Sequence, residues 1–153
     1  MPEDADAACA AVTAAFRGTP YLERMQESLE SALRFDDPEY LCLFAPPSDD
    51  GVPAGVVLFG TVLGARLTTK VHAVVASHPR VQLALLDAVR ETCVRSGERL
   101  VVCELPHDSS FDASAVALIA SGFHEEGRIA DFVRDGVALR LLVWRPAATE
   151  VES

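Results

Sequence analysis

The fold is decided by the stretch Lys70-Val-His-Ala-Val-Val-Ala-Ser-His-Pro-Arg-Val-Gln-Leu-Ala-Leu-Leu-Asp-Ala-Val89. Its first part, Val71–Ala76, is apolar almost throughout, which is typical of a strand covered on both faces. Ser77 and Pro79 then indicate the start of a helix. The apolar residues of that helix recur at helical spacing: Val81, Leu85, Leu86, Val89 and Cys93. The stretch therefore predicts a buried strand, a tight turn and an amphipathic helix.

Helices and strands on both sides of this stretch complete an α/β pattern. The elements expected before it are helices from Asp4 or Asp6 to about Phe16 and from Pro20 to Asp36-Asp37-Pro38, then strands over Tyr40–Phe44 and Gly55–Gly60. Those expected after it are a strand over Leu100–Leu105, a helix over Ala113–Ser121, and strands over Phe123–Ile129 and Val137–Trp144. This order predicts one α/β domain over residues 1–153, with a mixed sheet and helices on both of its faces.

The composition excludes several classes of function. A net charge of −10 with a single lysine, Lys70, argues against nucleic-acid binding, which depends on a basic surface. No apolar run approaches the ~20 residues that cross a bilayer, and the N-terminus lacks the features of a signal peptide. We therefore expect a cytoplasmic protein that does not bind membranes. The negative charge favours a cationic small substrate such as an amine, although solubility explains it equally well.

The cysteines and histidines do not predict a metal site. Four cysteines are widely spaced, at Cys9, Cys42, Cys93 and Cys103. They show neither the close pairing of zinc ligands nor the pattern of a disulfide framework. The four histidines are scattered, and no Cys-x-x-Cys motif occurs. We expect the cysteines to be structural, with Cys93 and Cys103 in the core.

The C-terminal part of the chain carries a family resemblance. The sequence reads Ala117-Leu-Ile-Ala-Ser-Gly-Phe-His-Glu-Glu-Gly-Arg-Ile-Ala-Asp-Phe-Val-Arg-Asp-Gly136. It resembles the GNAT superfamily of acyl-CoA N-acyltransferases in its helix, its Gly-Phe pair and its Arg-Asp-Gly turn. Leu85–Leu105 is similar to the central helix and following strand of that family. The resemblance is strongest over residues 56–145, and it implies a GNAT-like fold because several elements agree in order.

The resemblance implies an activity and a set of contacts. GNAT proteins transfer an acetyl or other acyl group from acyl-CoA to an amine, here a small-molecule amine. The family's acyl-CoA lies along the third strand and the start of the central helix. The positions of this sequence that would contact acetyl-CoA are therefore Val74, Val75, Arg80, Val81 and Gln82. Val71–Ala76 is expected to lie next to Leu100–Leu105 and to run parallel to it at the start, and the family's reaction cleft opens where the two strands diverge.

One departure from the family concerns the phosphates of acyl-CoA. GNAT proteins hold the pyrophosphate on a glycine-rich turn, through backbone amides at the N-terminus of the central helix. No glycine occurs between Gly64 and Gly97, and the turn after His78-Pro79 is about five residues short. Residues with a Cβ atom resist the left-handed backbone that such an anion site needs. We therefore expect a degenerate pyrophosphate-binding loop.

Two further departures concern the general acid and the first strand. Many GNAT proteins have a tyrosine at the position of Leu118 to protonate the departing thiolate, so this acid is missing. The chain begins at the first helix, so the family's first edge strand is expected to be missing or to lie before the start. Its absence would leave Tyr40–Phe44 as an exposed edge, which favours a homodimer.

Three residues are the candidate proton acceptors, and Glu104 is the leading one. Glu104 interrupts an apolar strand at the cleft, and such a carboxylate must be paired or exposed there. His72 lies on the neighbouring strand, and a histidine satisfied by a backbone partner is the structural alternative. His107 and the adjacent Asp108 follow the strand end, where a surface loop is the plain explanation. Lys70 and Arg140 are expected to be charges at the rim, and Tyr21 to pack in the core.

Three functions therefore stay open. The first is an N-acetyltransferase acting on a small amine. The second is a binding or regulatory protein with a degenerate GNAT fold, as the missing glycines, phenol and edge strand suggest. The third is acid–base chemistry without coenzyme A, with Glu104 and a histidine as the reacting groups.

Overall fold

The expected order of helices and strands is confirmed in a computed structural model, which describes residues 2–34, 37, 39–45 and 55–147. The elements are α1 (Pro2–Phe16), α2 (Leu22–Arg34), β1 (Leu41–Phe44), β2 (Gly55–Thr61), β3 (Thr68–Ala76), α3 (Pro79–Arg95), β4 (Leu100–Pro106), the short 3-10 helix η1 (Ser109–Phe111), α4 (Asp112–Ala120), β5 (His124–Arg134) and β6 (Val137–Trp144). Asp36 and Pro38, expected to end the second helix, lie outside the described residues.

The six strands form one mixed sheet in the order β1-β2-β3-β4-β6-β5. Only β3 and β4 are parallel, and α3 makes the connection between them. Their pairing covers Thr68–Lys70 against Leu100–Val102 and then stops, although both strands continue. The two strands therefore diverge after Lys70 and Val102. This confirms the expected neighbours and the expected parallel start.

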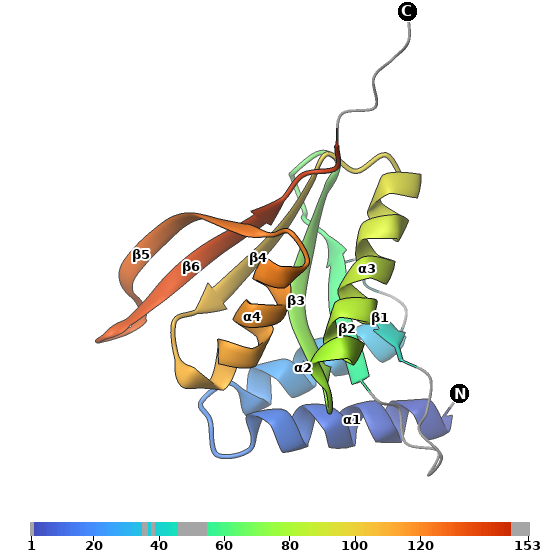
Figure 1. Cartoon of the computed structure of the whole chain (residues 1–153). Helices are drawn as coiled ribbons and strands as arrows, with labels where there is room; N and C mark the ends of the chain where they lie inside the picture. The colour runs from blue at the N-terminus through green and yellow to red at the C-terminus, as the bar shows by residue number, and fades with distance from the viewer. Residues whose placement is uncertain (1, 35–36, 38, 46–54, 148–153) are drawn as a thin grey trace, which may run out of the picture.

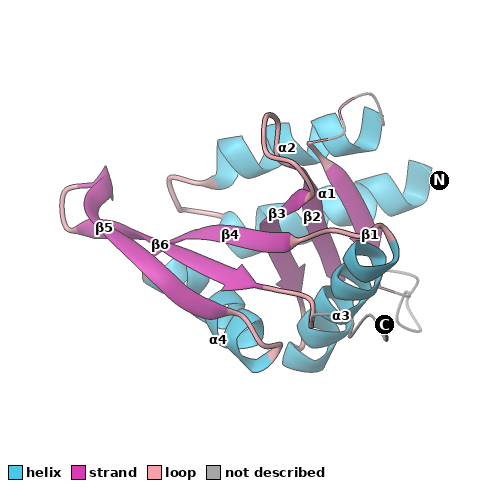
Figure 2. Cartoon of the chain, turned by 90° about the horizontal axis from the view of Figure 1, so that it is seen from above, coloured by secondary structure: helices cyan, strands magenta, loops and turns pink. Residues whose placement is uncertain are grey.

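Helices cover both faces of the sheet, as expected. Figure 2 shows α1 and α2 on one side of the strands and α3 and α4 on the other. Large side chains from every layer are fully buried between them, among them Leu29, Leu58, Leu86, Leu118 and Leu142. In the described part of the chain α1 is the first element, so β1 forms one edge of the sheet and β5 the other.

The β5–β6 hairpin projects from the body of the domain, at the left of Figure 1. Its turn contains Gly136, whose φ of 78° is readily adopted only by glycine. The N–H of Gly136 donates to Oδ1 of Asp131 at 2.7 Å, which ties the turn to the preceding strand. β5 extends to Arg134, five residues beyond its expected end at Ile129, and its register shifts between Ile129 and Arg134.

Helix α3 starts with a side-chain cap that its sequence supplies. His78 is the N-cap, one residue after the expected Ser77, and Pro79 occupies the first turn. The N–H of Arg80 donates to Nδ1 of His78 at 3.1 Å. Proline suits this position because the first N–H groups of a helix lack a partner in the helix. At the other end the chain turns at Gly97, with φ of 70°.

Candidate functional site

A cavity of about 620 Å³ lies between α2, the diverging strands β3 and β4, and the β5–β6 hairpin. Strand alternation places Lys70 and His72 on the same face of β3, and Glu104 of β4 lines the same cavity. The cavity therefore opens where the pairing of β3 with β4 has ended. Two of the predicted proton acceptors, His72 and Glu104, meet here.

Glu104 forms an ion pair across the divergence of the strands. Nζ of Lys70 donates to Oε2 of Glu104 at 2.8 Å. The Glu104 side chain is 47% exposed, while that of Lys70 is 24% exposed. Glu104 is thus paired and open to the cavity, which is one of the arrangements expected of a carboxylate in this strand. The expected rim position of Lys70 is corrected, because its ammonium group belongs to the cavity.

His72 is held in one orientation. Its Nε2 lies 2.9 Å from the backbone oxygen of Glu39, which can only accept, so Nε2 carries the proton. The ring also stacks on Tyr40, with 4.7 Å between ring centroids. In the neutral ring this leaves the lone pair of Nδ1 as the basic position. The backbone bond is the structural role anticipated for His72, and it leaves the second nitrogen available for chemistry.

The pKa of His72 is lowered from its ordinary value of 6.5. Burial is the main cause, because it disfavours the charged imidazolium. The bond to Glu39 opposes this effect, the cations Lys70 and Arg24 add to it, and Glu104 opposes it. His72 is therefore neutral at pH 7 and able to accept a proton.

Two further charged residues line the cavity. Arg24 projects from α2, and Glu39 precedes β1. Within the described residues, neither side chain has a hydrogen-bond or ion-pair partner. The remaining wall is mostly apolar and aromatic, with Met25, Tyr40, Val62, Leu63, Phe111, Phe132, Val133 and Leu139. The cavity thus combines a few charges with a large apolar surface, as ligand sites usually do.

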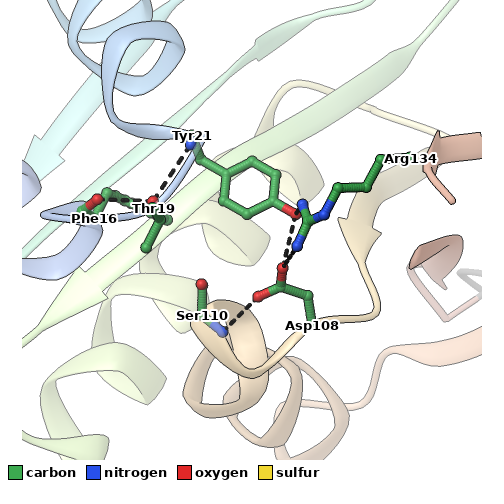
Figure 3. Close-up of polar contacts among 6 residues, drawn as sticks. All are labelled: Phe16, Thr19, Tyr21, Asp108, Ser110 and Arg134. Atoms are coloured by element: carbon green, nitrogen blue, oxygen red, sulfur yellow. Dashed lines mark hydrogen bonds and ion pairs between the residues drawn. The ribbon is translucent and has the colours of Figure 1, made fainter. Parts of the chain in front are cut away.

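One side of the cavity is fastened by a polar cluster of Tyr21, Asp108 and Arg134 (Figure 3). The Tyr21 hydroxyl donates to Oδ2 of Asp108 at 3.0 Å and accepts from Nη1 of Arg134 at 2.9 Å. Nη2 of Arg134 lies 2.7 Å from the same Asp108 oxygen. The cluster joins the start of α2, the loop after β4 and the end of β5, and the Tyr21 ring packs edge-on against Phe111. It therefore holds the projecting hairpin against the body of the domain.

The contacts within this cluster shift the pKa values of Asp108 and Tyr21. Burial alone would raise the pKa of Asp108, but hydrogen bonds from Ser110, Arg134 and Tyr21 outweigh it and lower the pKa to about 2. Burial raises the pKa of Tyr21, and the bond from Arg134 opposes that shift. Asp108 is therefore a stable anion, and Tyr21 stays protonated with its proton directed at Asp108. Tyr21 is not positioned as a free acid for the cavity.

The predicted acyl-CoA contacts lie elsewhere, at the end of β3 and the start of α3. Val74 is buried, and its carbonyl accepts a hydrogen bond from the Ser114 hydroxyl of α4 at 3.2 Å. Val75 is half-buried beside it. Neither residue lines the cavity. They lie on the diverging part of β3.

The first amides of α3 already have acceptors within the chain. Arg80 donates to the His78 side chain, and Val81 and Gln82 donate to the His78 carbonyl at 3.0 and 3.3 Å. Pro79 has no N–H to offer. The Gln82 side chain is buried, whereas Arg80 is exposed. An anion at this helix start would have to take the Arg80 amide from His78.

His107 lies outside the cavity. Its Nδ1 is 3.0 Å from Nη1 of Arg128, which is also bound to Glu125. Arg128 and Arg140 are opposite each other on β5 and β6. Arg140 is only 8% exposed, which corrects its expected place at the rim. The structure therefore brings His72 and Glu104 together and leaves His107 apart from them.

Two of the four cysteines lie in the core as expected, whereas Cys42 is half-buried and Cys9 is exposed. Cys93 and Cys103 are buried. Burial raises the pKa of Cys103 to about 12, so this thiol is not a nucleophile near neutral pH. Among the described residues, no group of three or more histidine, cysteine, aspartate or glutamate residues is arranged to hold a metal ion. None of the helices in that part of the chain is long and apolar enough to cross a membrane.

Sequence reasoning missed Lys70, Arg24 and Glu39 as residues of the site. The alternation of β3 was the available signal for Lys70, because it shares a strand face with His72 two residues later. No comparable signal marks Arg24 or Glu39, since their place over the cavity depends on how α2 packs on the sheet.

Comparison with known proteins identifies the fold. No protein-family model and no curated protein matches the sequence. Among solved structures, a Desulfovibrio desulfuricans protein assigned to the GNAT acetyltransferases has a TM-score of 0.80 at 21% identity, over 95% of this chain and 94% of that one. The aminoglycoside 6'-N-acetyltransferase of Enterococcus faecium has a TM-score of 0.72 at 12% identity, over 95% and 92%.

A third similar structure was solved with acetyl-CoA. It is an acetyltransferase-like protein of Salmonella typhimurium, with a TM-score of 0.68 at 17% identity over 97% of this chain and 93% of that one. Each of these likenesses extends over nearly the full length of both chains. The six-stranded mixed sheet with its four α-helices therefore has the fold of the GNAT acetyltransferases.

Proposed function

We propose that this protein transfers an acetyl or other acyl group from acyl-CoA to the amine of a small molecule. The observation that carries the proposal is the divergence of β3 from β4 into a cavity that contains a neutral, oriented histidine. Such a gap between two parallel strands gives a thioester access to a site that is lined by both of them. The fold, which the chain shares with acetyltransferases, supports the same reaction without establishing it.

We assign the proton-accepting role to His72. Nε2 is held by the Glu39 carbonyl, so a proton from the attacking amine would go to Nδ1. The lowered pKa keeps the ring in its basic form at neutral pH. The amine nitrogen forms its bond to the acyl carbon, the carbon–sulfur bond breaks, and the thiolate takes a proton from water because Leu118 provides none.

Glu104 takes a supporting role in this proposal. Its carboxylate is already bound to Lys70, and about half of the side chain is exposed. An anion at this position attracts the positively charged amine substrate toward His72. This assignment reverses the order expected from sequence, where Glu104 was the leading proton acceptor. His107, which is bound to Arg128 outside the cavity, takes no part.

The proposed acyl-CoA contacts are those that the sequence predicted: Val74 and Val75 on β3, and Arg80, Val81 and Gln82 at the start of α3. We propose that the pyrophosphate is held weakly there. The Arg80 amide donates to His78, and the amides of Val81 and Gln82 donate to the His78 carbonyl. Arg80 would supply a charge, but a phosphate would compete with contacts that the helix already makes.

A second function is favoured by the hydrogen bonds that already occupy the first amides of α3. If the satisfied amides of α3 exclude acyl-CoA altogether, the cavity would bind a small molecule or carry out acid–base chemistry without coenzyme A. His72 and Glu104 would then be the reacting groups. The cavity supports both functions, and only the use of acyl-CoA separates them.

The test is a direct assay of acyl transfer. The purified protein is incubated with acetyl-CoA and a panel of primary amines, and free thiol and acetylated amine are measured together. We expect equal amounts of the two products, at a rate well above that of the uncatalysed reaction. Thiol release without acetylated amine, or no reaction at millimolar acetyl-CoA, would contradict the proposal and favour the second function.

A further inference from the structure

The cavity contains two cations and two anions, and only one cation is paired with one anion. Lys70 and Glu104 bind each other at 2.8 Å. Arg24 and Glu39 line the same cavity, and within the described chain neither of their side chains has a hydrogen-bond or ion-pair partner. The pairing therefore leaves one positive and one negative group for a ligand. A ligand that carries one carboxylate and one ammonium group complements both.

The basic residues make a simple amine a poor match for this site. The chain has 13 basic residues against 23 acidic ones, and its single lysine lines this cavity together with Arg24. Because Lys70 is paired with Glu104, Arg24 is the cation left to repel an ammonium group, whereas a carboxylate on the same molecule is attracted to it. Arg24 also acts on the titration of His72, so the cation stands close to the proposed proton acceptor. Arg24, Glu39 and His72 line one cavity, so a molecule that carries both a carboxylate and an amine complements them.

The apolar part of the cavity indicates which side chain the ligand carries. Met25, Phe111, Phe132 and Leu139 all contribute to its wall. Phe132 is 61% exposed in the structure, and a bulky apolar group beside it would remove apolar surface from water. A cavity of about 620 Å³ has room for such a side chain.

We propose that the acceptor is a free α-amino acid with a bulky apolar side chain, an inference that rests on the proposed acyl transfer. Arg24 binds its carboxylate, and Glu39 attracts its ammonium group. The amine loses one proton to solvent and attacks the acyl carbon, and Nδ1 of His72 takes the second proton. The N–C bond forms, the C–S bond breaks, and the products are an N-acyl amino acid and free thiol.

The test compares three acceptors that differ only around the carboxylate: L-phenylalanine, its amide, and phenethylamine. Acetyl transfer is measured as kcat/KM for each. We expect L-phenylalanine to exceed the other two by about 10- to 100-fold, the usual worth of a charge-assisted hydrogen bond. Equal or better use of the amide or the amine would overturn the inference.

Two variants assign the preference to one residue. Arg24→Gln should remove the preference for the carboxylate, so that kcat/KM falls about 10- to 100-fold further for L-phenylalanine than it does for phenethylamine. Arg34→Gln is the matched control, because Arg34 lies exposed at the end of the same helix and, among the described residues, pairs with Glu30 alone. Loss of the preference in Arg34→Gln, or its survival in Arg24→Gln, would overturn the assignment.

Binding without acyl-CoA separates this inference from the proposed reaction. Millimolar L-phenylalanine should raise the melting temperature of the wild-type protein but not that of Arg24→Gln. If L-phenylalanine raises the melting temperature of the wild type alone and no acceptor is acetylated, the acyl-transfer proposal fails and the ligand class stands. If amines are acetylated without a preference for the carboxylate, the ligand class fails and the reaction stands. If neither binding nor transfer is seen, both are overturned.

Discussion

The cavity is lined by β3, and α3 begins shortly after that strand ends, yet the cavity and the start of α3 offer a ligand very different surroundings. In the cavity, the side chains of Arg24 and Glu39 have no hydrogen-bond or ion-pair partner within the described residues, and His72 uses only Nε2 of its ring to bind the Glu39 carbonyl. At the start of α3, the Arg80 amide is bound to His78, and Pro79 has no amide proton. The cavity therefore presents charged side chains and a basic nitrogen to a ligand, whereas the first amides of α3 are already hydrogen-bonded within the chain.

This difference indicates where binding energy for a ligand is available. A polar group without a partner gains from a ligand, whereas a satisfied amide first has to give up its existing bond. The cavity can therefore bind and react with an acceptor, while the helix start binds phosphate weakly. The variants below test the cavity and the cluster that fastens the hairpin beside it, in order of the expected effect.

His72→Gln should have the largest effect. Glutamine keeps an N–H donor for the Glu39 carbonyl and removes the basic nitrogen. We expect kcat for acetyl transfer to fall by roughly 10²- to 10³-fold, as for the loss of a general base. Stopped assays of the wild type and the variant at saturating acceptor measure this, with circular dichroism to confirm folding. A variant with more than a third of wild-type kcat would remove His72 from the mechanism.

The pH dependence of the acetyl-transfer rate, compared between the wild type and His72→Gln, tests the assignment of His72 as the proton acceptor. Because burial lowers the pKa of His72, the wild-type rate should rise with pH to a plateau, with a midpoint below 6.5. His72 also contributes to stability in its neutral form. That contribution is complete above about 6.5 and is lost as the pH falls through the lowered pKa of the folded state. In His72→Gln this rise of the rate with pH should disappear. A rise with an unchanged midpoint would show that another group causes it.

Glu104→Gln should have an intermediate effect. The substitution keeps the size of the side chain and a hydrogen-bonding oxygen for Lys70, but it removes the charge that attracts the amine. We expect kcat/KM to fall about tenfold, mainly through KM, because the loss is electrostatic attraction and not base catalysis. A fall of 10²-fold or more in kcat would instead return the proton-accepting role to Glu104.

Asp108→Asn should have the smallest effect on activity and a measurable one on stability. The pKa of Asp108 is lowered to about 2, so its ionised form stabilises the fold above pH 3.8, and this contribution is lost as the pH falls toward 2. After allowance for solvent screening we expect a loss of about 1 kcal/mol in the free energy of unfolding at pH 7. Urea unfolding at pH 7 and pH 3 measures it.

The control for this variant is Asp135→Asn, an exposed carboxylate near the same hairpin turn. It should leave the free energy of unfolding at pH 7 within about 0.5 kcal/mol of the wild type, as most surface substitutions do. Equal losses in the two variants would show that the Tyr21–Asp108–Arg134 cluster does not fasten the hairpin.

The elements of the fold could be predicted from the sequence because their signals are local. The apolar run Val71–Ala76 predicted β3, and the helical spacing from Val81 to Cys93 predicted α3. The resemblance around Gly122-Phe123 added the strand order, which no local pattern supplies. The end of β5 was placed too early, because the chain beyond Ile129 lacks strand alternation and its register is irregular.

The site could be predicted only in part. The strand positions of His72 and Glu104 located the cleft, because parallel strands that separate leave a gap between them. The ion pair of Glu104 with Lys70 joins residues 34 positions apart, and the bond of Tyr21 to Asp108 joins residues 87 positions apart. Contacts at such separations depend on tertiary packing. The cap of His78 on Arg80 is local, but a histidine cap is uncommon, and Ser77 was expected to start the helix.

A calorimetric titration of the protein with acetyl-CoA tests the central claim most directly. We propose that the cavity supports acyl transfer, whereas the start of α3 binds the phosphates of acetyl-CoA only weakly. We therefore expect saturable binding with a dissociation constant in the high micromolar range, corresponding to about 5 kcal/mol. A low-micromolar constant would contradict the weak grip at α3, and the absence of binding at millimolar acetyl-CoA would contradict the acyltransferase itself.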